Sequence, residues 1–579
     1  MADPQTTLAA AVTQAMIAAL GPQAEGADPV IRPAGNPKFG DFQANFAMPL
    51  GKQLGRPPRQ IAAAVVDQLD LGGVCSRVEV AGPGFVNLTL DGGWLAAETG
   101  LLLGDDRLGV PLDPEPKKVI VDYSGPNVAK EMHVGHLRST IIGDALVRTL
   151  RWAGHDVIAQ NHIGDWGTPF GMLIEHLLDV GEQEAAHELS VGDLTAFYQQ
   201  ARATFDSDPG FAERSSRRVV TLQAGDPQTL QLWHVLVEQS KRYFNTVYER
   251  LGVLLTDDDL AGESLYNDQL ADVVAELEAK GLAVVDDGAL CVFPPGFTGR
   301  DGQPLPLIIR KSDGGYGYAT TDLAAIRYRT SQLGGQRILY LVDAGQHQHL
   351  SMVIAVGRQA GWLAPGVEAE HVAFGLVLGP DGRRLRTRSG DNPKLIDLLD
   401  EAVERAAAAV AAKNPELPAD TRAAVARAVG IGSVKYADLS SDRIKDYVFD
   451  WDRMLSFDGN TAAYLINAYV RIRSILRRAE GEPGVSAVLI TAPEERALAL
   501  ALLRFDRVIA SVVERSEPHL LATYLFELAQ AFTAFYEGCP VLRAATQQLR
   551  QSRLTLCEIT ARTLATGLGL LGIETVDQM

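Results

Sequence analysis

The spacing of apolar residues changes twice between residues 119 and 161, and this change predicts a strand, a helix and a second strand. Residues 119–123 and 157–161 are short apolar runs, whereas apolar side chains between residues 135 and 153 recur every three or four positions. A strand–helix–strand unit of this length predicts two parallel strands joined by a right-handed crossover. Ligands bind such sheets at the carboxyl ends of the strands. Here both strands are followed by polar, glycine-containing segments, 124–127 and 161–167, which are expected to face one crevice.

The same patterns divide the first two thirds of the chain into two domains. Residues 1–110 predict a small α/β domain, and the segment 104–116, with its three prolines, predicts a linker. A Rossmann-like domain with a parallel sheet is expected at 117–375, with a charge-rich helical insertion at about 190–251. Further strands are predicted at 290–293, 307–310, 316–319 and 338–342.

The last third of the chain is predicted to be mostly helical. Residues 376–450 contain a basic signature loop followed by connecting helices, and residues 451–579 predict an all-α bundle. One uninterrupted helix is expected at 493–516. The chain as a whole is therefore predicted to be a multidomain α/β protein with a helical C-terminal domain.

Length and composition agree with a multidomain protein. At 579 residues the chain is too long for one hydrophobic core. We find no signal-peptide pattern and no apolar run long enough to cross a membrane, so we expect a cytoplasmic protein without a membrane partner. The four scattered cysteines argue against disulfides and against a structural metal. The net charge of −19 argues weakly against nucleic acid as a partner, although arginines nearly balance acids within 451–579.

Two histidines, His133 and His136, lie where the first strand has ended and the helix begins. They could bind zinc, although two ligands are too few and no H-E-x-x-H motif is present. They could also cap the helix, or hold phosphates, because free N–H groups and the positive dipole at a helix start attract anions. Gly135 leaves room for a nucleotide to approach the backbone. Lys130 and the basic loop 383–388 would add positive charge.

The segment around the histidines resembles the HIGH motif of class I aminoacyl-tRNA synthetases. The longer string S-G-P-N-V-A-K-E-M-H-V-G-H-L-R-S-T is similar to the arginyl-tRNA synthetase family in particular. Further motifs of that family follow along essentially the whole chain: F-G-D-F-Q, N-H-I-G-D-W-G, G-E-S, Y-A-T-T-D-L-A, V-D-A-G-Q-H-Q-H, T-R-S-G and F-Y-E-G-C-P. Each motif alone has modest specificity, whereas their ordered succession is highly specific.

The resemblance implies an arginine–tRNA ligase. Such an enzyme uses ATP with Mg²⁺ to convert L-arginine to arginyl-adenylate and releases diphosphate. It then transfers arginine to the 3′-terminal adenosine of tRNA(Arg). Because we see no heptads or swapped-looking arms, we expect a monomer.

The resemblance also implies catalytic and ATP-binding residues. The catalytic residues are Lys130, His133, His136, Arg384 and Arg388, and the ATP-binding residues are His133, Gly135, His136 and His349. The chain departs from the family signature K-M-S-K-S, because Thr387 stands where the second lysine is found. Arginyl enzymes commonly lack that lysine, and Lys130 is expected to replace it.

A site for arginine must accept hydrogen bonds, since a guanidinium offers five donors and no acceptor. Tyr318 and Asp322 match family contacts to the arginine side chain, with Asp322 as the bidentate partner, and Glu263 matches a further acid. An ordinary helix start with a Thr or Asp cap is the alternative interpretation of 318–322. The positions expected to bind the α-amino and carboxylate groups are Asp122, Asn127 and Gln346.

Two surfaces are expected to contact tRNA. Near the N-terminus, Asn36, Phe39 and Gln43 could stack on and hydrogen-bond to an unstacked base. The alternative is a loop whose phenylalanines anchor it in the core. In the C-terminal bundle, aromatic and basic residues suit anticodon bases, with buried tyrosines and solvated arginines as the alternative. The residues proposed there are Tyr464, Tyr469, Arg471, Tyr536 and Met579.

Two other functions compete with arginine ligation. A nucleotidylyltransferase with the same histidine signature would transfer a nucleotide to a small molecule, but the large helical domain and the acids suited to a guanidinium argue against it. A non-catalytic RNA-binding relative is the second alternative. The presence of Asn127, Lys130, His133, Asp322 and Gln346 argues against it.

Overall fold

A four-stranded parallel sheet lies at the centre of the computed structural model, which describes residues 3–579 except 168, 182–193, 300–301, 387–391 and 480–486. Its strands are β5 (Lys118–Asp122), β6 (Asp156–Gln160), β10 (Arg337–Tyr340) and β11 (Glu368–His371), in the order β11-β10-β5-β6. Asp122 pairs with Tyr340 on one side and with Gln160 on the other, so three strands end at the same level. Helix α5 (Val134–Trp152) connects β5 to β6. The predicted parallel strand–helix–strand unit is confirmed.

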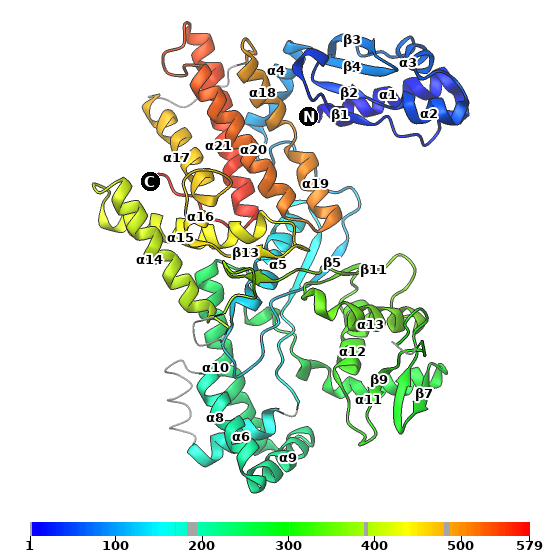
Figure 1. Ribbon diagram of the computed structural model, residues 1–579, viewed down its shortest axis with the longest axis vertical. Coiled ribbons are helices and arrows are strands. Elements are labelled where there is room, and N and C mark those ends of the chain that lie inside the picture. The colour runs from blue at the N-terminus through cyan, green and yellow to red at the C-terminus, as the bar shows by residue number, and fades with distance from the viewer. Residues whose placement is uncertain (1–2, 168, 182–193, 300–301, 387–391, 480–486) are drawn as a thin grey trace.

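The N-terminal domain is built on a separate antiparallel sheet (Figure 1). The strand order is β1-β2-β4-β3, and helices cover the sheet. Its elements are α1 (Pro4–Leu20), β1 (Ile31–Pro33), β2 (Phe42–Ala44), α2 (Ala47–Leu54), α3 (Pro58–Val66), β3 (Cys75–Ala81) and β4 (Phe85–Leu90). Helix α4 (Gly92–Leu101) leads out of this domain and packs against α18 (Pro493–Leu502) of the C-terminal region.

Among the residues that the structure describes, the segment predicted as a helical insertion is mostly helical, with short turns between its helices. Its helices, together with α6 before them, form the lower teal part of Figure 1. They are α6 (Pro169–Val180), α8 (Leu194–Ser207), α9 (Pro209–Gln223) and α10 (Pro227–Leu251). Helix α10 returns to the sheet domain, where its buried side chains meet the loops after β5 and β6.

A smaller α/β segment follows, and one predicted strand in it is wrong. Residues 316–319 are predicted to form a strand, but Tyr318 begins helix α12. Helix α12 packs against α11 and β9, and in its first turn Ala319 is buried whereas Tyr318 is exposed. The remaining elements are α11 (Leu270–Ala279), β7 (Ala283–Asp286), β8 (Ala289–Val292), β9 (Leu307–Arg310), α12 (Tyr318–Ser331) and α13 (His347–Gln359).

The C-terminal region is mostly helical, as predicted, but one predicted helix is divided and two short strands, β12 (Val377–Leu378) and β13 (Tyr447–Val448), are added. The helix expected at 493–516 is two helices, α18 (Pro493–Leu502) and α19 (Phe505–Arg515). The break lets α18 pack against α4 while α19 reaches α5 beside the central sheet. The other elements are α14 (Leu395–Lys413), α15 (Ala419–Leu439), α16 (Trp451–Met454), α17 (Ala462–Arg478), α20 (His519–Gly538) and α21 (Gln547–Leu570).

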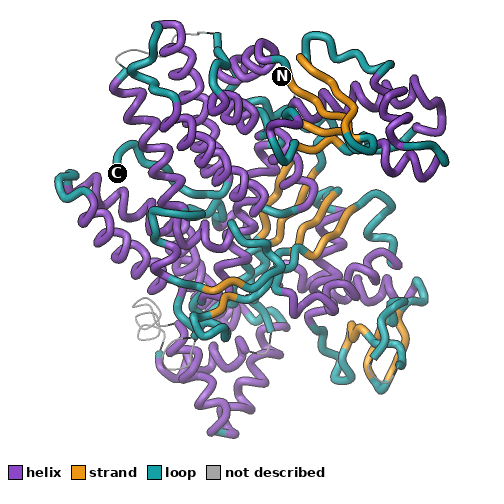
Figure 2. Tube along the Cα trace, turned by 45° about the horizontal axis from the view of Figure 1, so that its top comes forward, coloured by secondary structure: helices purple, strands orange, loops and turns teal. Residues whose placement is uncertain are grey.

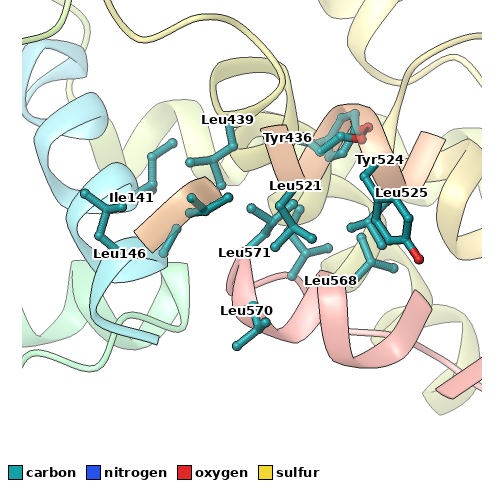
Figure 3. Packing of buried hydrophobic residues seen from close by; sticks show 14 of the residues in the cluster. Ile141, Leu146, Tyr436, Leu439, Leu521, Tyr524, Leu525, Leu568, Leu570 and Leu571 are labelled. Atoms are coloured by element: carbon teal, nitrogen blue, oxygen red, sulfur yellow. Dashed lines mark hydrogen bonds between the residues drawn. The ribbon is translucent and has the colours of Figure 1, made fainter. Parts of the chain in front are cut away.

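Helix α5 joins the sheet domain to the C-terminal helices through one hydrophobic core (Figure 3). Ile141 and Leu146 of α5 belong to the same buried cluster as Leu439 of α15, Leu521 of α20 and Leu568 of α21. Full burial of each such side chain contributes about 1.5–3 kcal/mol. The helix that begins at the histidine pair is therefore fixed by packing on its sheet side and on its C-terminal-domain side. None of the described helices is long and apolar enough to cross a membrane.

Candidate active site

A cleft of about 670 Å³ lies at the carboxyl ends of β5, β6 and β10. In the order β10-β5-β6, the chain leaves β5 toward one edge of the sheet and leaves β10 toward the other. The loops after these two strands therefore diverge, and a cleft opens between them. Most of the residues predicted for arginine and ATP line it: Asp122, Asn127, His133, Gly135, His136, Glu263, Tyr318, Asp322, Gln346, His349 and Arg384. Two predicted catalytic residues are not among the lining residues. Lys130 lies beside the cleft, and Arg388 lies outside the described residues.

The two histidines cap the helix and also face the cleft. His133 is the N-cap of α5, and its Nδ1 accepts a hydrogen bond from the Gly135 N–H at 3.0 Å. His136 Nδ1 accepts from the His133 N–H at 3.1 Å, and the ring centroids are 4.1 Å apart. Because each Nδ1 accepts, the proton of a neutral ring is on Nε2. The capping interpretation is therefore correct, and it leaves both Nε2–H groups as donors for a ligand.

The environment keeps both imidazoles neutral. Burial lowers the pKa of His133, and the nearby charges of Arg384 and Lys130 lower it further. Burial, followed by the influence of His133, lowers the pKa of His136 to about 3. A Cβ at Gly135 would lie 2.7 Å from His133 Cε1, so a larger residue there would push the imidazole out of its position. The histidines can therefore act as hydrogen-bond donors near pH 7 without carrying charge.

Cationic side chains lie close to the histidine pair. Arg384 Nη2 lies 3.6 Å from the position a Cβ on Gly135 would take, which places the guanidinium at the start of α5. A backbone bridge between Leu378 and Arg384 positions this part of the basic loop. The Lys130 ammonium lies 4.4 Å from the centre of the Tyr198 ring of α8. Both cations are near enough to influence the pKa of His133.

Acidic groups occupy the other part of the cleft. Burial raises the pKa of Glu263 to about 8, and the negative charges of Asp165 and Asp322 contribute to this shift. Asp165 is held by the Ser264 hydroxyl and N–H at 2.6 and 2.9 Å. The Tyr318 ring is 71% exposed and lines the same cleft. Buried acids that repel one another suit a ligand that brings positive charge.

His349 lies beside these acids. Its Nε2 is 2.6 Å from Asp322 Oδ2, and this hydrogen bond raises the pKa of the imidazole. The sequence placed His349 with ATP, whereas the structure pairs it with an acid predicted to bind arginine. Within the described part of the chain no side chain caps α12, which begins after Gly317. The alternative interpretation of 318–322 is therefore correct about the helix start and wrong about the Thr or Asp cap.

Asp122 and Asn127 have structural partners as well as a place in the cleft. Asp122 Oδ2 accepts a hydrogen bond at 2.7 Å from Arg329, a fully buried arginine on α12. Its negative charge is thus already partly compensated. Asn127 forms a backbone bridge with Gly164, where a Cβ would lie 2.3 Å from Asn127 Oδ1. Gln346 is exposed in the turn before α13.

Several residues that hold the cleft together were not identified from the sequence. Ser139 and Thr140 of α5, Asn161 after β6, and Ser240 and Tyr248 of α10 hydrogen-bond the loop after β5. Their signal in the sequence is weak, since Ser240 and Tyr248 are polar positions on an otherwise apolar helix face. In the regions that the structure describes, no group of three or more His, Cys, Asp or Glu residues could hold a metal ion.

The predicted N-terminal contacts differ in their exposure. Phe39 is 38% exposed, and the Lys38 ammonium lies 4.7 Å from the centre of its ring, so this phenylalanine does not anchor the loop. Asn36 is exposed and accepts a hydrogen bond from the Lys38 N–H. Gln43 is half-buried and donates to Asn87 at 2.7 Å. The anchoring alternative holds for Phe42, which is buried in β2.

The predicted C-terminal contacts lie on α17 and α20 and at the chain end. Arg471 and Tyr536 are exposed, with the guanidinium carbon 5.6 Å from the ring centre. Tyr464 and Tyr469 are half-buried, and Tyr464 contacts Thr533 and Phe526 of α20. Met579 is half-buried, and its carbonyl accepts a hydrogen bond from Asn414.

Three family models match most of the chain. The model described as tRNA synthetases class I (R), catalytic domain, matches residues 99–451. The DALR anticodon binding domain matches residues 465–579, and the arginyl tRNA synthetase N terminal domain matches residues 6–90.

Individual proteins give the same result. An arginine–tRNA ligase of Thermobifida fusca is 58% identical, with 100% of both chains covered, and one of Escherichia coli is 50% identical over 99% of this chain and 100% of the relative. The arginyl-tRNA synthetase of Plasmodium falciparum superposes with a TM-score of 0.86 at 28% identity over 100% of both chains. That of Thermus thermophilus gives 0.80 at 27% identity over 99% and 100%.

Proposed function

This chain belongs to the arginyl-tRNA synthetase family, and we propose that it activates L-arginine with ATP and transfers it to the 3′-terminal adenosine of tRNA(Arg). The full-length similarity to arginine–tRNA ligases supports this function. The observation that carries it in the structure is the division of one cleft into an acidic part with Glu263 and Asp322 and a part lined by neutral imidazoles and Arg384.

The acidic part suits the side chain of arginine. A guanidinium is planar and binds carboxylates through paired N–H donors. Asp322 supplies a carboxylate near the N-terminal end of α12, and Glu263 supplies a second carboxylate. The exposed Tyr318 hydroxyl adds a further acceptor. His349 Nε2 already contacts Asp322 Oδ2 at 2.6 Å, and the remaining lone pairs of this carboxylate can accept hydrogen bonds from the guanidinium. Asn127 and Gln346 are proposed to bind the α-amino and carboxylate groups, together with Asp122.

The histidine part suits the α-phosphate of ATP. In the first step the arginine carboxylate attacks the α-phosphorus, the bond to the bridging oxygen breaks, and diphosphate leaves with the electron pair. Negative charge grows on the phosphoryl oxygens in the transition state. The Nε2–H groups of His133 and His136 and the Arg384 guanidinium stabilise that charge more than they stabilise the ground state. Lys130 is proposed to supply the charge of the lysine that Thr387 replaces.

In the second step a hydroxyl of the terminal adenosine attacks the carbonyl of the adenylate, and AMP leaves. Phe39 and Arg471 with Tyr536 are proposed tRNA contacts, since they are exposed rings and cations that can stack on bases. Mg²⁺ is proposed to arrive with ATP and to screen the diphosphate charge. The monomeric state and the cytoplasmic location stay predictions.

Aminoacylation assays test the proposal. The chain is incubated with ATP, Mg²⁺, tRNA(Arg) and each of the common amino acids separately. We expect charging with arginine alone, loss of most activity in Asp322→Asn, and normal activity in Glu401→Gln, which removes an exposed acid of α14. Charging with another amino acid, or nucleotide transfer that needs no amino acid, would contradict the proposed function.

A further inference from the structure

The loop that carries Asn127 and Lys130 has an unusual backbone. Ser124 and Ala129 have φ values of +74° and +58°, in the left-handed region that residues with a side chain rarely adopt. Each such residue costs free energy and persists only where surrounding contacts hold it. Asn127 lies between these two residues in the chain, and Lys130 follows the second. The geometry of two proposed site residues therefore depends on what holds Ser124 and Ala129.

Helix α10 provides hydrogen bonds to both strained positions. The Tyr248 hydroxyl lies 2.8 Å from Ser124 Oγ, and Ser240 Oγ accepts the Ala129 N–H at 2.9 Å. Tyr248 is 2% exposed and Ser240 is fully buried, so water does not replace these partners. Residues 240 and 248 are about two helical turns apart and share one face of α10.

The same helix also fixes the loop after β6. Tyr248 accepts a hydrogen bond from Asn161 Nδ2 at 2.9 Å, and Asn161 Oδ1 accepts the Gly125 N–H at 3.0 Å. About two helical turns before Ser240, the Trp233 indole N–H donates to the Asp165 carbonyl at 2.7 Å. Helix α10 thus contacts both polar loops of the cleft.

A chain of hydroxyls continues from α10 to the histidine pair. Ser124 Oγ is 3.0 Å from Thr140 Oγ1, which donates to the His136 carbonyl at 2.7 Å. The path from Asn161 through Tyr248, Ser124 and Thr140 therefore ends at the helix start that carries His133 and His136. Neither Tyr248 nor Ser240 lines the cleft, so both act through other residues.

We propose that Tyr248 and Ser240 of α10 are positioning residues for adenylate formation, holding the loop 124–130 in the conformation that presents Asn127 and Lys130. This inference rests on the proposed function, because it assigns the loop to the arginine and ATP sites. It gives the helical insertion a role in the chemical step, in addition to its role in packing. Loss of either hydroxyl lets the strained loop relax, so that a smaller fraction of the molecules has the reactive geometry.

The test uses the full chain and two matched pairs of variants. Tyr248→Phe keeps the ring and removes the hydroxyl, and Ser240→Ala leaves the Ala129 N–H without its partner. The controls are Tyr436→Phe and Ser552→Ala. Tyr436 is a buried tyrosine whose hydroxyl hydrogen-bonds to Asn460 and to the Ala522 carbonyl. Ser552 is a buried serine whose hydroxyl accepts a hydrogen bond from the Leu489 N–H at 2.8 Å.

We measure Tm by calorimetry, and kcat and KM for arginine, ATP and tRNA in pyrophosphate exchange with tRNA present. All four variants are expected to lower Tm slightly. Only Tyr248→Phe and Ser240→Ala are expected to lower kcat, by about tenfold, with the KM for tRNA unchanged. In the double variant the loss is expected to be less than the product of the single losses, because both hydroxyls hold one loop.

Three results would decide against the inference. The first is a kcat within twofold of the unmodified chain in Tyr248→Phe at a Tm lowered as in Tyr436→Phe. The second is an equal loss of kcat in the controls. The third, if Tyr248→Phe does not fold, is a normal kcat in Ser240→Ala. Failure of the unmodified chain to activate arginine would instead contradict the proposed function.

Discussion

Arginine binding is expected to release a proton, and the source is Glu263. Burial together with the charges of Asp165 and Asp322 raises the pKa of this carboxyl to about 8 in the free protein. At pH 7 most molecules therefore hold Glu263 protonated and neutral. A bound guanidinium favours the carboxylate and lowers this pKa, so binding and ionisation are coupled.

The sign and size of the effect follow from the pKa. Below pH 8 each arginine that binds must first displace a proton, so affinity rises with pH and levels off above the pKa. Relative to the plateau, Kd is expected to be weaker by about tenfold at pH 7 and about a hundredfold at pH 6, or about 1.4 kcal/mol per pH unit. About 0.9 proton is released per arginine at pH 7.

Isothermal titration calorimetry in buffers of different ionisation enthalpy measures both quantities. Glu263→Gln is the reference variant, because ionisation of the ligand and of His349 is common to both proteins. Their Kd ratio between pH 6 and 8.5 isolates Glu263. A ratio that does not change with pH, or proton uptake at pH 7, would refute the reasoning.

Three further predictions concern the histidine site and the core. Lys130→Ala is expected to lower the kcat of adenylate formation by at least tenfold while changing the Kd of arginine less than threefold, because its charge acts on the phosphates; near-normal kcat in pyrophosphate exchange would rule this out. Gly135→Ala places a Cβ 2.7 Å from His133 Cε1 and should lower kcat/KM for ATP by about a hundredfold or more, with little change in Tm; a normal value would show that the imidazole can move without loss. Arg138→Met removes the partner of the buried Asp438, 3.1 Å away, and should lower the free energy of unfolding by about 3–5 kcal/mol in a denaturant titration; a loss below 1 kcal/mol would mean that the pair is not coupled to stability.

The parts of the fold that the sequence predicted correctly depend on local periodicity. The β5–α5–β6 unit could be predicted because its apolar residues change between a run and a helical repeat within a short segment. The strand predicted at 316–319 is wrong because a segment of four residues is too short for its periodicity to separate a strand from the start of a helix, and α12 begins at Tyr318. The break between α18 and α19 could not be predicted, since Leu503 and Arg504 are compatible with a helix and tertiary packing decides the turn.

In the candidate site, too, the sequence predicted some features correctly and missed others. The family motifs, taken together, predicted that His133, Glu263 and Asp322 belong to one site, although these residues come from distant segments of the chain. It could not predict that His349 binds Asp322, because a side-chain pair across two helices leaves no pattern in either segment. Nor could it identify Tyr248, whose hydroxyl matters only because β5 and β6 end beside α10.

The central claim is that the acidic part of the cleft recognises a positive guanidinium while the histidine part holds the phosphates. Citrulline tests it most directly, because a neutral urea replaces the guanidinium in a side chain of nearly the same shape. We measure kcat/KM for tRNA charging with arginine and with citrulline in the unmodified chain. Arginine is expected to be preferred by about 10⁴-fold or more, because the urea of citrulline brings no positive charge to Glu263 and Asp322 and presents an oxygen acceptor where the guanidinium presents N–H donors. Charging with citrulline within about tenfold of arginine would contradict the account.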